Sequence, residues 1–370
     1  MKRSLASFTR ISVARFPLKC QPQRVFATHG SGLPLHPDSS HSAPPLPFSR
    51  YISPDRHVGI VGAPFSGGQP LLGVDLGPRY IRKGGLIQRL EKDSWRVHDN
   101  GDINIPNTIK EEEENDKNSN VKRAVTVGSV NRSLYDSAQT VLQSNHFLLT
   151  LGGDHSIGIG SIAAVLKHRP DVGIVWIDAH ADINTPSTSS SGNPHGMVLA
   201  FLMNLESSRD VNGFDWMDKL EIPKLDPQRL VYIGLRDLDE GEKLIIKKLN
   251  IKSFTMHDVD KVGIGQVMTR AIDHLTHFAP RPIHLSLDID SIDPLYAPST
   301  GTRVAGGLSY REAYYVCESL AETGMLTSMD MVEVNPSINE KGEELLKEDS
   351  ERTIQMAIGL IASAMGNKIL

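Results

Sequence analysis

Three groups of acidic and imidazole side chains in this sequence directly follow short apolar runs. The middle group follows residues 173–177 at intervals of two, a spacing that on an extended backbone places its side chains on one side of the chain. Carboxylate oxygens with imidazole nitrogens, and no thiolate, suit Mn²⁺ better than a structural zinc ion. The candidate ligands are His155, Asp178, His180, Asp182, Asp288 and Asp290.

Two carboxylates at the end of a buried strand are costly without a cation. Asp288 and Asp290 end the apolar run 282–287, and they would repel each other and lose hydration unless cations lay between them. Asp178 and Asp288 could each bridge two ions, whereas Asp154 is interpreted as a turn residue or a support behind the ligands. An isolated Asp-x-His pair is usually a surface or capping pair, but three such groups after three apolar strands favour a metal centre.

The elements that must position these groups alternate between strands and helices. Such alternation predicts an α/β fold with a mostly parallel sheet covered by helices on both faces, and ligands of such sheets bind at the carboxyl ends of the strands. The predicted strands cover residues 57–61, 95–98, 147–151, 173–177, 230–235, 251–254, 282–287 and 326–334. The predicted helices cover residues 80–90, 129–143, 161–167, 242–249, 264–278, 310–323 and 351–365.

Composition excludes several classes of protein. The 370 residues carry a formal net charge of -5, which does not favour nucleic acid or an anionic membrane as a partner. No apolar run approaches the roughly 20 residues that span a bilayer. The two cysteines, Cys20 and Cys317, make no disulfide framework and indicate a reducing compartment.

The amino-terminal part differs in composition from the rest. Residues 1–33 are basic, free of acidic residues and amphipathic, which predicts a mitochondrial transit peptide; a disordered tail on a cytoplasmic protein is the alternative. Residues 34–55 are predicted to be a Pro-rich linker, and residues 56–370 a single catalytic domain. The acidic run 108–120 is interpreted as a surface loop.

Several motifs carry a family resemblance. Gly152–Ser156, Asp178–Asn184 and Ser286–Pro294 resemble the three signatures of the ureohydrolases. The surrounding sequence resembles the arginase family in particular, at Asn184–Pro186, Ser191–Asn193, His195–Gly196, Gly234–Asp237 and Met331–Pro336. The resemblance implies a three-layer αβα domain with an eight-stranded sheet, two Mn²⁺ per subunit, and cleavage of L-arginine to L-ornithine and urea by a metal-bridging hydroxide.

The same resemblance implies roles for individual residues. One ion would be held by His155, Asp178, Asp182 and Asp288, and the other by His180, Asp178, Asp288 and Asp290. Asp182 would handle a proton near the metals, and His195 would serve as acid or proton shuttle for the leaving amine. Glu333 would pair with the guanidinium group. The substrate-binding set implied by the resemblance is Asn184, Ser191, Asn193, Asp237, Asp239, Thr302 and Glu333.

Specificity is expected from the far end of the substrate. Asn184, Ser191 and Asn193 would receive the α-carboxylate, and Asp239 the α-ammonium group. Agmatine lacks that carboxylate and would leave these polar groups unpaired. The alternative interpretation of residues 185–193 is an ordinary flexible Ser-rich loop. The alternative functions are an agmatinase or another guanidino-substrate hydrolase, and a non-catalytic arginine-binding protein.

Some positions depart from the usual arginase pattern. Pro194 precedes His195 where an aliphatic residue is common, and Arg303 adds a cation where proline is expected. The basic leader, and an end soon after the last helix, resemble the plant-type arginases. Arg311 and Glu312 match trimer-interface positions of the family, so a homotrimer or a dimer of trimers is expected.

Overall fold

The computed structural model describes residues 51–105, 119–337 and 347–368. The predicted transit peptide, most of the predicted linker (residues 34–50) and most of the acidic run 108–120 lie outside these ranges. No helix in the described ranges is long and apolar enough to cross a membrane.

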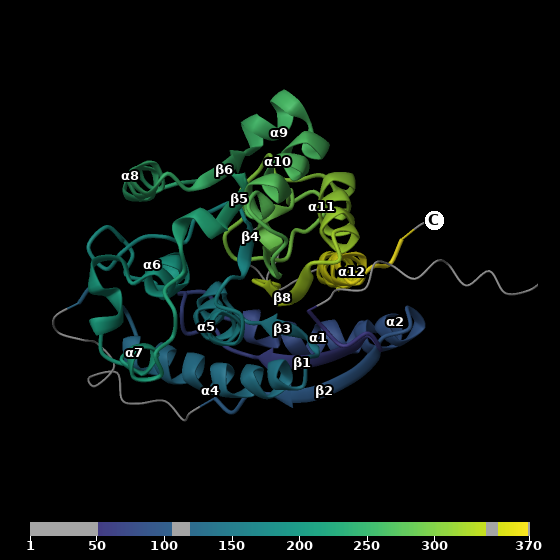
Figure 1. The fold of residues 1–370 in the computed structure, drawn as a ribbon, viewed down its shortest axis with the longest axis horizontal. Coiled ribbons are helices and arrows are strands. Elements are labelled where there is room, and N and C mark those ends of the chain that lie inside the picture. Colours follow the sequence, from purple (N-terminus) through teal and green to yellow (C-terminus); the bar gives the residue numbers. More distant parts are fainter. Residues whose placement is uncertain (1–50, 106–118, 338–346, 369–370) are drawn as a thin grey trace, which may run out of the picture. The chain divides into compact units, whose positions relative to one another are not determined.

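Eight parallel strands form the central sheet, in the order β2-β1-β3-β8-β7-β4-β5-β6 (Figure 1). The predicted α/β fold is therefore confirmed, and every strand pair is parallel. The last two strands of the sequence, β7 and β8, lie between β3 and β4. In sheet order the strands are β2 (Arg96–Asp102), β1 (His57–Ala63), β3 (Phe147–Gly152), β8 (Leu326–Val332), β7 (Ile283–Asp288), β4 (Gly173–Ile177), β5 (Leu230–Leu235) and β6 (Lys252–Thr255).

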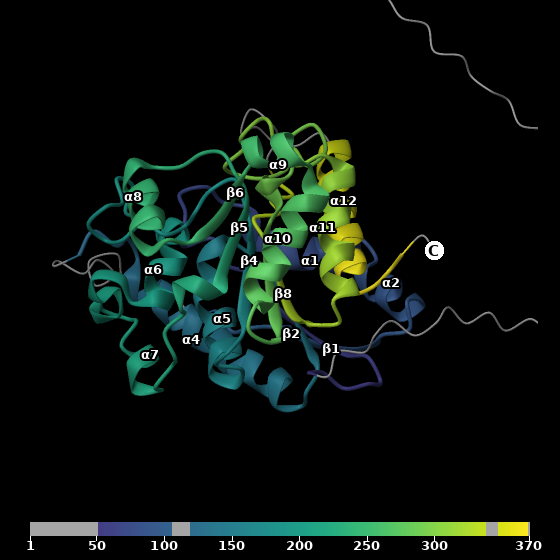
Figure 2. The same ribbon diagram turned by 45° about the horizontal axis from the view of Figure 1, so that its top comes forward.

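Helices cover both faces of the sheet and enclose two hydrophobic cores. One core lies under α4 (Ala124–Gln143), α5 (Gly158–His168), α6 (Val198–Met203), α7 (Trp216–Lys219) and α8 (Glu240–Leu249). The other lies under α1 (Gly77–Lys83), α2 (Leu86–Lys92), α9 (Met256–Val262), α10 (Ile264–Thr276), α11 (Tyr310–Glu322) and α12 (Lys347–Ala364). Figures 1 and 2 both show α9 to α12 gathered together, away from α4 and α5.

Short 3₁₀ helices connect many of these elements. They are η1 (Val74–Leu76), η2 (His155–Ile157), η3 (Pro194–Met197), η4 (Leu205–Asp210), η5 (Pro227–Arg229) and η6 (Ile289–Ser291). Of these, η2, η3 and η6 carry or adjoin candidate site residues.

The helices differ from the prediction in two respects. The helix predicted over 80–90 is two helices, because Gly85 has φ 101°, which interrupts the chain between α1 and α2. Helices α6, α7 and α9 were not predicted. Every residue of α6 is buried, so its sequence lacks the alternation of apolar and polar faces that identifies a surface helix.

Candidate metal centre and cleft

The six candidate ligands meet at the carboxyl end of the sheet, as predicted from the strand ends. They lie at or just after the ends of β3, β4 and β7, three of the four central strands. One group of potential ligand atoms consists of His155, Asp178 and Asp288, and a second of Asp178, His180 and Asp290. Asp178 belongs to both groups.

His155 is the centre of the first group. Its Nδ1 lies 3.1 Å from an oxygen of Asp178, 3.0 Å from one of Asp182 and 3.1 Å from one of Asp288. This nitrogen is buried and makes no hydrogen bond of acceptable geometry. A nitrogen without a partner that faces three carboxylates is the arrangement expected around a cation.

His180 is the centre of the second group. Its Nδ1 lies 3.3 Å from Asp178 Oδ1 and 3.2 Å from Asp290 Oδ2. The backbone from Asp178 to Asp182 is not extended. The prediction that an extended backbone places these side chains on one side of the chain is therefore wrong. Asp178 Oδ1 accepts a hydrogen bond from the His180 backbone N–H at 2.7 Å, and Asp182 has φ 49°. A turn, rather than the alternation of a strand, makes the side chains converge.

The donor set fits divalent cations. Burial raises the pKa of Asp288 well above its usual value, and the charges of Asp290 and Asp178 add to this effect. Burial also raises the pKa of Asp182, with repulsion from Asp178, to about 6. Cations between these groups would relieve the repulsion and keep the carboxylates ionised.

Neighbouring residues hold the ligands in place. The His155 ring stacks on Trp176 with centroids 4.1 Å apart, and its Nε2 lies 2.9 Å from Ser286 Oγ. That contact leaves Nδ1 to face the carboxylates. Trp176 Nε1 donates to Asp178 at 3.0 Å, and Thr302 Oγ1 donates to Asp290 at 2.8 Å.

Asp154 is not in either ligand group. Its Oδ1 accepts a hydrogen bond from the Ser156 backbone N–H, and its Oδ2 accepts one from Gly68 N–H at 2.7 Å. The Gly68 carbonyl in turn accepts from His195 N–H at 3.2 Å. The loop after β1 therefore connects the turn after β3 to the segment that carries His195.

A cleft of about 170 Å³ opens beside the two ligand groups. Five of the seven expected substrate-binding residues line its wall: Asn184, Ser191, Asp237, Asp239 and Thr302. The full lining is His180, Asp182, Asn184, Ser189, Ser191, His195, Gly196, Asp237, Asp239, Glu242, Asp288 and Thr302.

His195, which lines the cleft, pairs with Glu333, which is buried and does not line it. His195 Nδ1 lies 3.4 Å from Glu333 Oε1. Burial lowers the pKa of His195, but the hydrogen bond and charge of Glu333 outweigh it, and the pKa rises to about 9. Glu333 is buried behind the cleft, where its carboxylate accepts hydrogen bonds from the His155 backbone N–H and from Gln69 Nε2.

The loop expected to bind the far end of a substrate is internally hydrogen-bonded. Asn184 Nδ2 donates to Asp239 Oδ2 at 2.9 Å, and Asn184 Oδ1 accepts from Thr188 Oγ1 at 2.9 Å. Asn193 does not line the cleft, and its side-chain oxygen accepts from Lys122 Nζ at 3.5 Å. Lys122 adds a positive charge near this loop that the motifs gave no reason to expect.

Other supporting residues were also missed. The Arg236 guanidinium donates to the backbone carbonyls of Asp290, Ser291 and Val304, so it fixes the segment that carries Asp290. Burial raises the pKa of Glu242 in the cleft wall to about 7. Gln69, in the loop after β1, donates from Nε2 to the Glu333 carboxylate.

The two departures from the family pattern are both accommodated. Pro194 is the first residue of η3, a position that favours proline. Arg303 Nε donates to the Pro298 carbonyl, and Arg303 is not among the residues that line the cleft.

Comparison with known proteins identifies the family. A model of the arginase family matches residues 56–366. A hepatic arginase of Aquarana catesbeiana is 45% identical over 313 residues, 84% of this chain and 93% of its own length. A mitochondrial arginase-2 of Rattus norvegicus is 41% identical, covering 88% of each chain. The crystal structure of Bacillus caldovelox arginase has 39% identity and a TM-score of 0.75, over 85% of this chain and all of its own. The chain belongs to the arginase family and is an amidinohydrolase.

Proposed function

We propose that this chain hydrolyses the guanidinium group of L-arginine, giving L-ornithine and urea, and that it does so with two Mn²⁺ ions. The observation that carries this proposal is the pair of His and Asp groups that share Asp178 beside the cleft. His155, Asp178, Asp182 and Asp288 would hold one ion, and His180, Asp178, Asp288 and Asp290 the other. Two bound Mn²⁺ ions would supply a water molecule with a lowered pKa as the nucleophile.

The charge of the site suits a guanidinium cation. Four of the six proposed ligands are carboxylates, so the four positive charges of two divalent ions would only neutralise the four negative charges of these ligands. Asp237, Asp239 and Glu242 bring three more acidic side chains to the cleft wall. Glu333 would orient the guanidinium plane. A carboxylate offers about four lone-pair positions, and Gln69, the His155 backbone and His195 use only three of them. Thr302 would hold Asp290 in place.

His195 would give a proton to the leaving amine, and Asp182 would hold a proton near the nucleophile. A general acid must be protonated before the reaction, and Glu333 raises the pKa of His195 to about 9. The buried Glu333 carboxylate therefore keeps this imidazole charged at neutral pH.

The cleft wall would select the amino-acid end of the substrate. Asn184 and Ser191 would donate to the α-carboxylate, with Asn193 beside them, and Lys122 lies close enough to Asn193 to attract the same group. Asp239 and Asp237 would face the α-ammonium group. A substrate without the carboxylate would leave these donors unpaired.

One assay tests the reaction, the substrate and the metal together. Urea release is measured from L-arginine and from agmatine, with Mn²⁺ added and then removed by a chelator. We expect turnover of arginine that depends on Mn²⁺ and exceeds that of agmatine at least a hundredfold, on the order of what a lost buried polar contact costs. A preference for agmatine would replace this assignment with that of an agmatinase, and no turnover of either would favour a binding protein.

We also propose that residues 1–33 direct the chain to mitochondria, with 34–55 as a linker and 56–370 as the catalytic domain. The basic, acid-free composition of the first segment supports this, and one similar protein is a mitochondrial arginase-2. Fusing residues 1–55 to a fluorescent protein would test it, because cytoplasmic fluorescence would rule out targeting by this segment. The basic, acid-free composition of residues 1–33 also supports placing this chain in the plant-type subgroup of the arginases.

The proposed assembly is a homotrimer or a dimer of trimers. Arg311 is exposed, as an interface residue of an isolated subunit would be. Glu312 already accepts a hydrogen bond from Ser309 N–H at 2.8 Å within its own chain. Light scattering on the purified protein measures the mass, and a monomer at micromolar concentration would exclude this assembly.

A further inference from the structure

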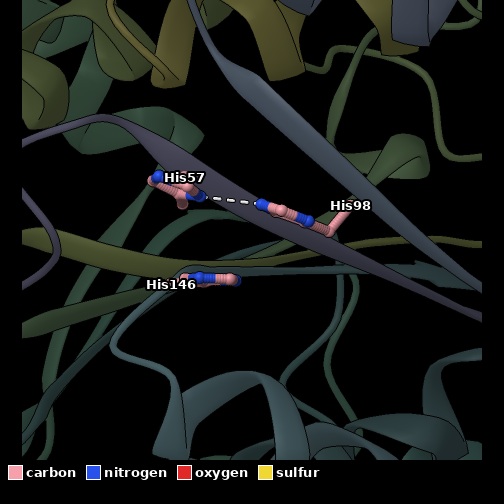
Figure 3. A group of neighbouring side chains, drawn as sticks. All are labelled: His57, His98 and His146. Carbon is pink, nitrogen blue, oxygen red and sulfur yellow. Dashed lines mark hydrogen bonds between the residues drawn. The ribbon is translucent and has the colours of Figure 1, made fainter.

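Three histidines gather near the amino ends of β1, β2 and β3, away from the carboxyl ends that carry the metal centre. His57 begins β1, His98 lies in β2 opposite Gly59, and His146 immediately precedes β3. Figure 3 shows the three rings side by side, each from a different strand segment. Nothing in the proposed arginine hydrolysis uses them.

The rings are in direct contact. Their centroids lie 5.0 Å apart for His57 and His98, 4.8 Å for His57 and His146, and 4.6 Å for His98 and His146. His57 Nδ1 and His98 Nε2 are joined by a hydrogen bond of 2.7 Å (Figure 3). One nitrogen of each ring lies within 4.8 Å of the others.

The hydrogen bonds indicate neutral imidazoles. Arg96 Nη1 lies 3.5 Å from His57 Nε2, and a guanidinium group can only donate, so this nitrogen accepts. His57 therefore carries its proton on Nδ1 and donates to His98 Nε2, which must be unprotonated. Burial lowers the pKa of His146, and the neighbouring His98 and His57 lower it further. Neutral imidazole is the form that binds a metal ion.

We propose that His57, His98 and His146 bind a single divalent transition-metal ion of borderline softness, with Zn²⁺ as the representative. Three atoms at most 4.8 Å apart have a common centre at most about 2.8 Å from each, and Zn–N bonds measure about 2.0–2.1 Å. Each nitrogen must therefore move inward by roughly 0.7 Å. The stacked rings must also turn, because lone pairs in parallel ring planes do not converge. His98 is exposed and the other two rings are half-buried, which allows these rotations.

This site differs in chemistry from the arginine-hydrolysing centre. The cluster offers imidazole nitrogens and no carboxylate, a set that favours Zn²⁺, Cu²⁺ or Ni²⁺ over Mn²⁺. Three protein ligands leave a fourth position to water. The bound ion would connect the edge strand β2, most of which is exposed, to β1 and β3. It would therefore act as a clamp at this edge of the sheet.

The test measures Zn²⁺ binding to the full chain loaded with Mn²⁺. Wild type, His98→Gln, His146→Gln and the control His257→Gln, an exposed histidine of α9, are dialysed against micromolar Zn²⁺ with excess Mn²⁺. Retained metals are then counted. Any Zn²⁺ that replaces Mn²⁺ at the proposed hydrolytic centre should be bound equally by all four proteins. A difference in Zn²⁺ content between the proteins therefore reports on the three-histidine site. We expect wild type and His257→Gln to retain one more Zn²⁺ per chain than His98→Gln and His146→Gln, whose affinity falls at least tenfold.

A second measurement identifies the ligands. Cu²⁺ added to the Mn²⁺-loaded protein should give an electron paramagnetic resonance spectrum with splitting from several imidazole nitrogens, absent in His98→Gln. Arginine hydrolysis with Mn²⁺ should be unchanged in His98→Gln, which verifies that the variant is folded. The proposal is overturned if His98→Gln retains as much Zn²⁺ per chain as wild type.

Discussion

The pairing of His195 with Glu333 links proton transfer to the metal centre at the scale of single residues. Glu333 accepts a hydrogen bond from the backbone of the ligand His155 and lies 3.4 Å from the imidazole of His195. One buried carboxylate thus positions a candidate metal ligand and raises the pKa of the proposed acid. A change at His195 should therefore affect turnover without removing any ligand atom.

We expect His195→Asn to lower kcat for arginine by about 10²- to 10⁴-fold, the usual contribution of a positioned acid or base. The Mn²⁺ content should equal that of wild type, because His195 is in neither ligand group. Steady-state urea release and metal analysis measure the two quantities, with His257→Asn as a control on an exposed helix. A decrease in kcat of less than threefold would rule out a role of His195 in proton transfer.

The raised pKa of His195 also predicts a pH dependence of stability in protein treated with EDTA. The folded pKa is about 9, above the unfolded value of about 6.5. The protonated ring therefore stabilises the fold fully below pH 6.5, and this contribution is lost as the pH rises through 9. We expect wild type to exceed His195→Asn in unfolding free energy by up to about 3 kcal/mol at pH 6, and by much less at pH 10. Urea denaturation at both pH values measures this, and a constant difference would contradict it.

At the scale of elements, the sequence predicted where the site residues follow strands but not how they converge. Apolar runs of about five residues identified β3, β4, β5 and β7, because strands buried on both faces need apolar side chains throughout. The turns were not predictable in the same way. Asp182 and Glu333 have φ values of 49° and 61°, a conformation that non-glycine residues adopt only when tertiary contacts hold them there. Arg236 was missed because its partners are backbone carbonyls, which leave no pattern in the sequence.

The contact between α4 and α5 predicts an effect on stability. A Cβ at Gly160 would lie 2.3 Å from the Asn131 carbonyl oxygen, so α5, which follows the His155 turn, would have to move. We expect Gly160→Ala to destabilise the protein by about 1–3 kcal/mol. Gly265→Ala in α10 is the control, since its Cβ would come no closer than 3.3 Å to the Tyr315 hydroxyl, and helix propensity would stabilise it by up to about 1 kcal/mol. Urea denaturation measures the free energy of unfolding of both variants. An equal change in Gly160→Ala and Gly265→Ala would contradict the close approach of Gly160 to the Asn131 carbonyl.

At the scale of the whole molecule, the ligands connect separate parts of the sheet. The candidate ligands lie at or just after the ends of β3, β4 and β7, so metal ions bound there would stabilise the packing of segments distant in sequence. The unfolded chain cannot offer this arrangement. Metal affinity at this proposed centre would therefore contribute directly to the free energy of folding.

Removal of the metal should lower the thermal stability. We expect EDTA to reduce the Tm of wild type by several degrees, since a ligand at a hundred times its Kd stabilises by about 2.7 kcal/mol per site. Added Mn²⁺ should restore it. Asp178→Asn, which alters a residue common to both ligand groups, should lose most of the Mn²⁺-dependent shift in differential scanning calorimetry. An identical Tm for wild type in Mn²⁺ and EDTA would contradict a metal centre that joins the strands.

The position of β7 and β8 between β3 and β4 has a consequence for biosynthesis. When β3 and β4 have left the ribosome, the two strands that must separate them in the finished sheet have yet to be translated. A nascent chain therefore carries His155 and Asp178 long before they can meet. Hydrolytic competence therefore has to wait until β7 has been translated, and we expect a messenger truncated ahead of β7 to yield an inert polypeptide instead of a weakened enzyme.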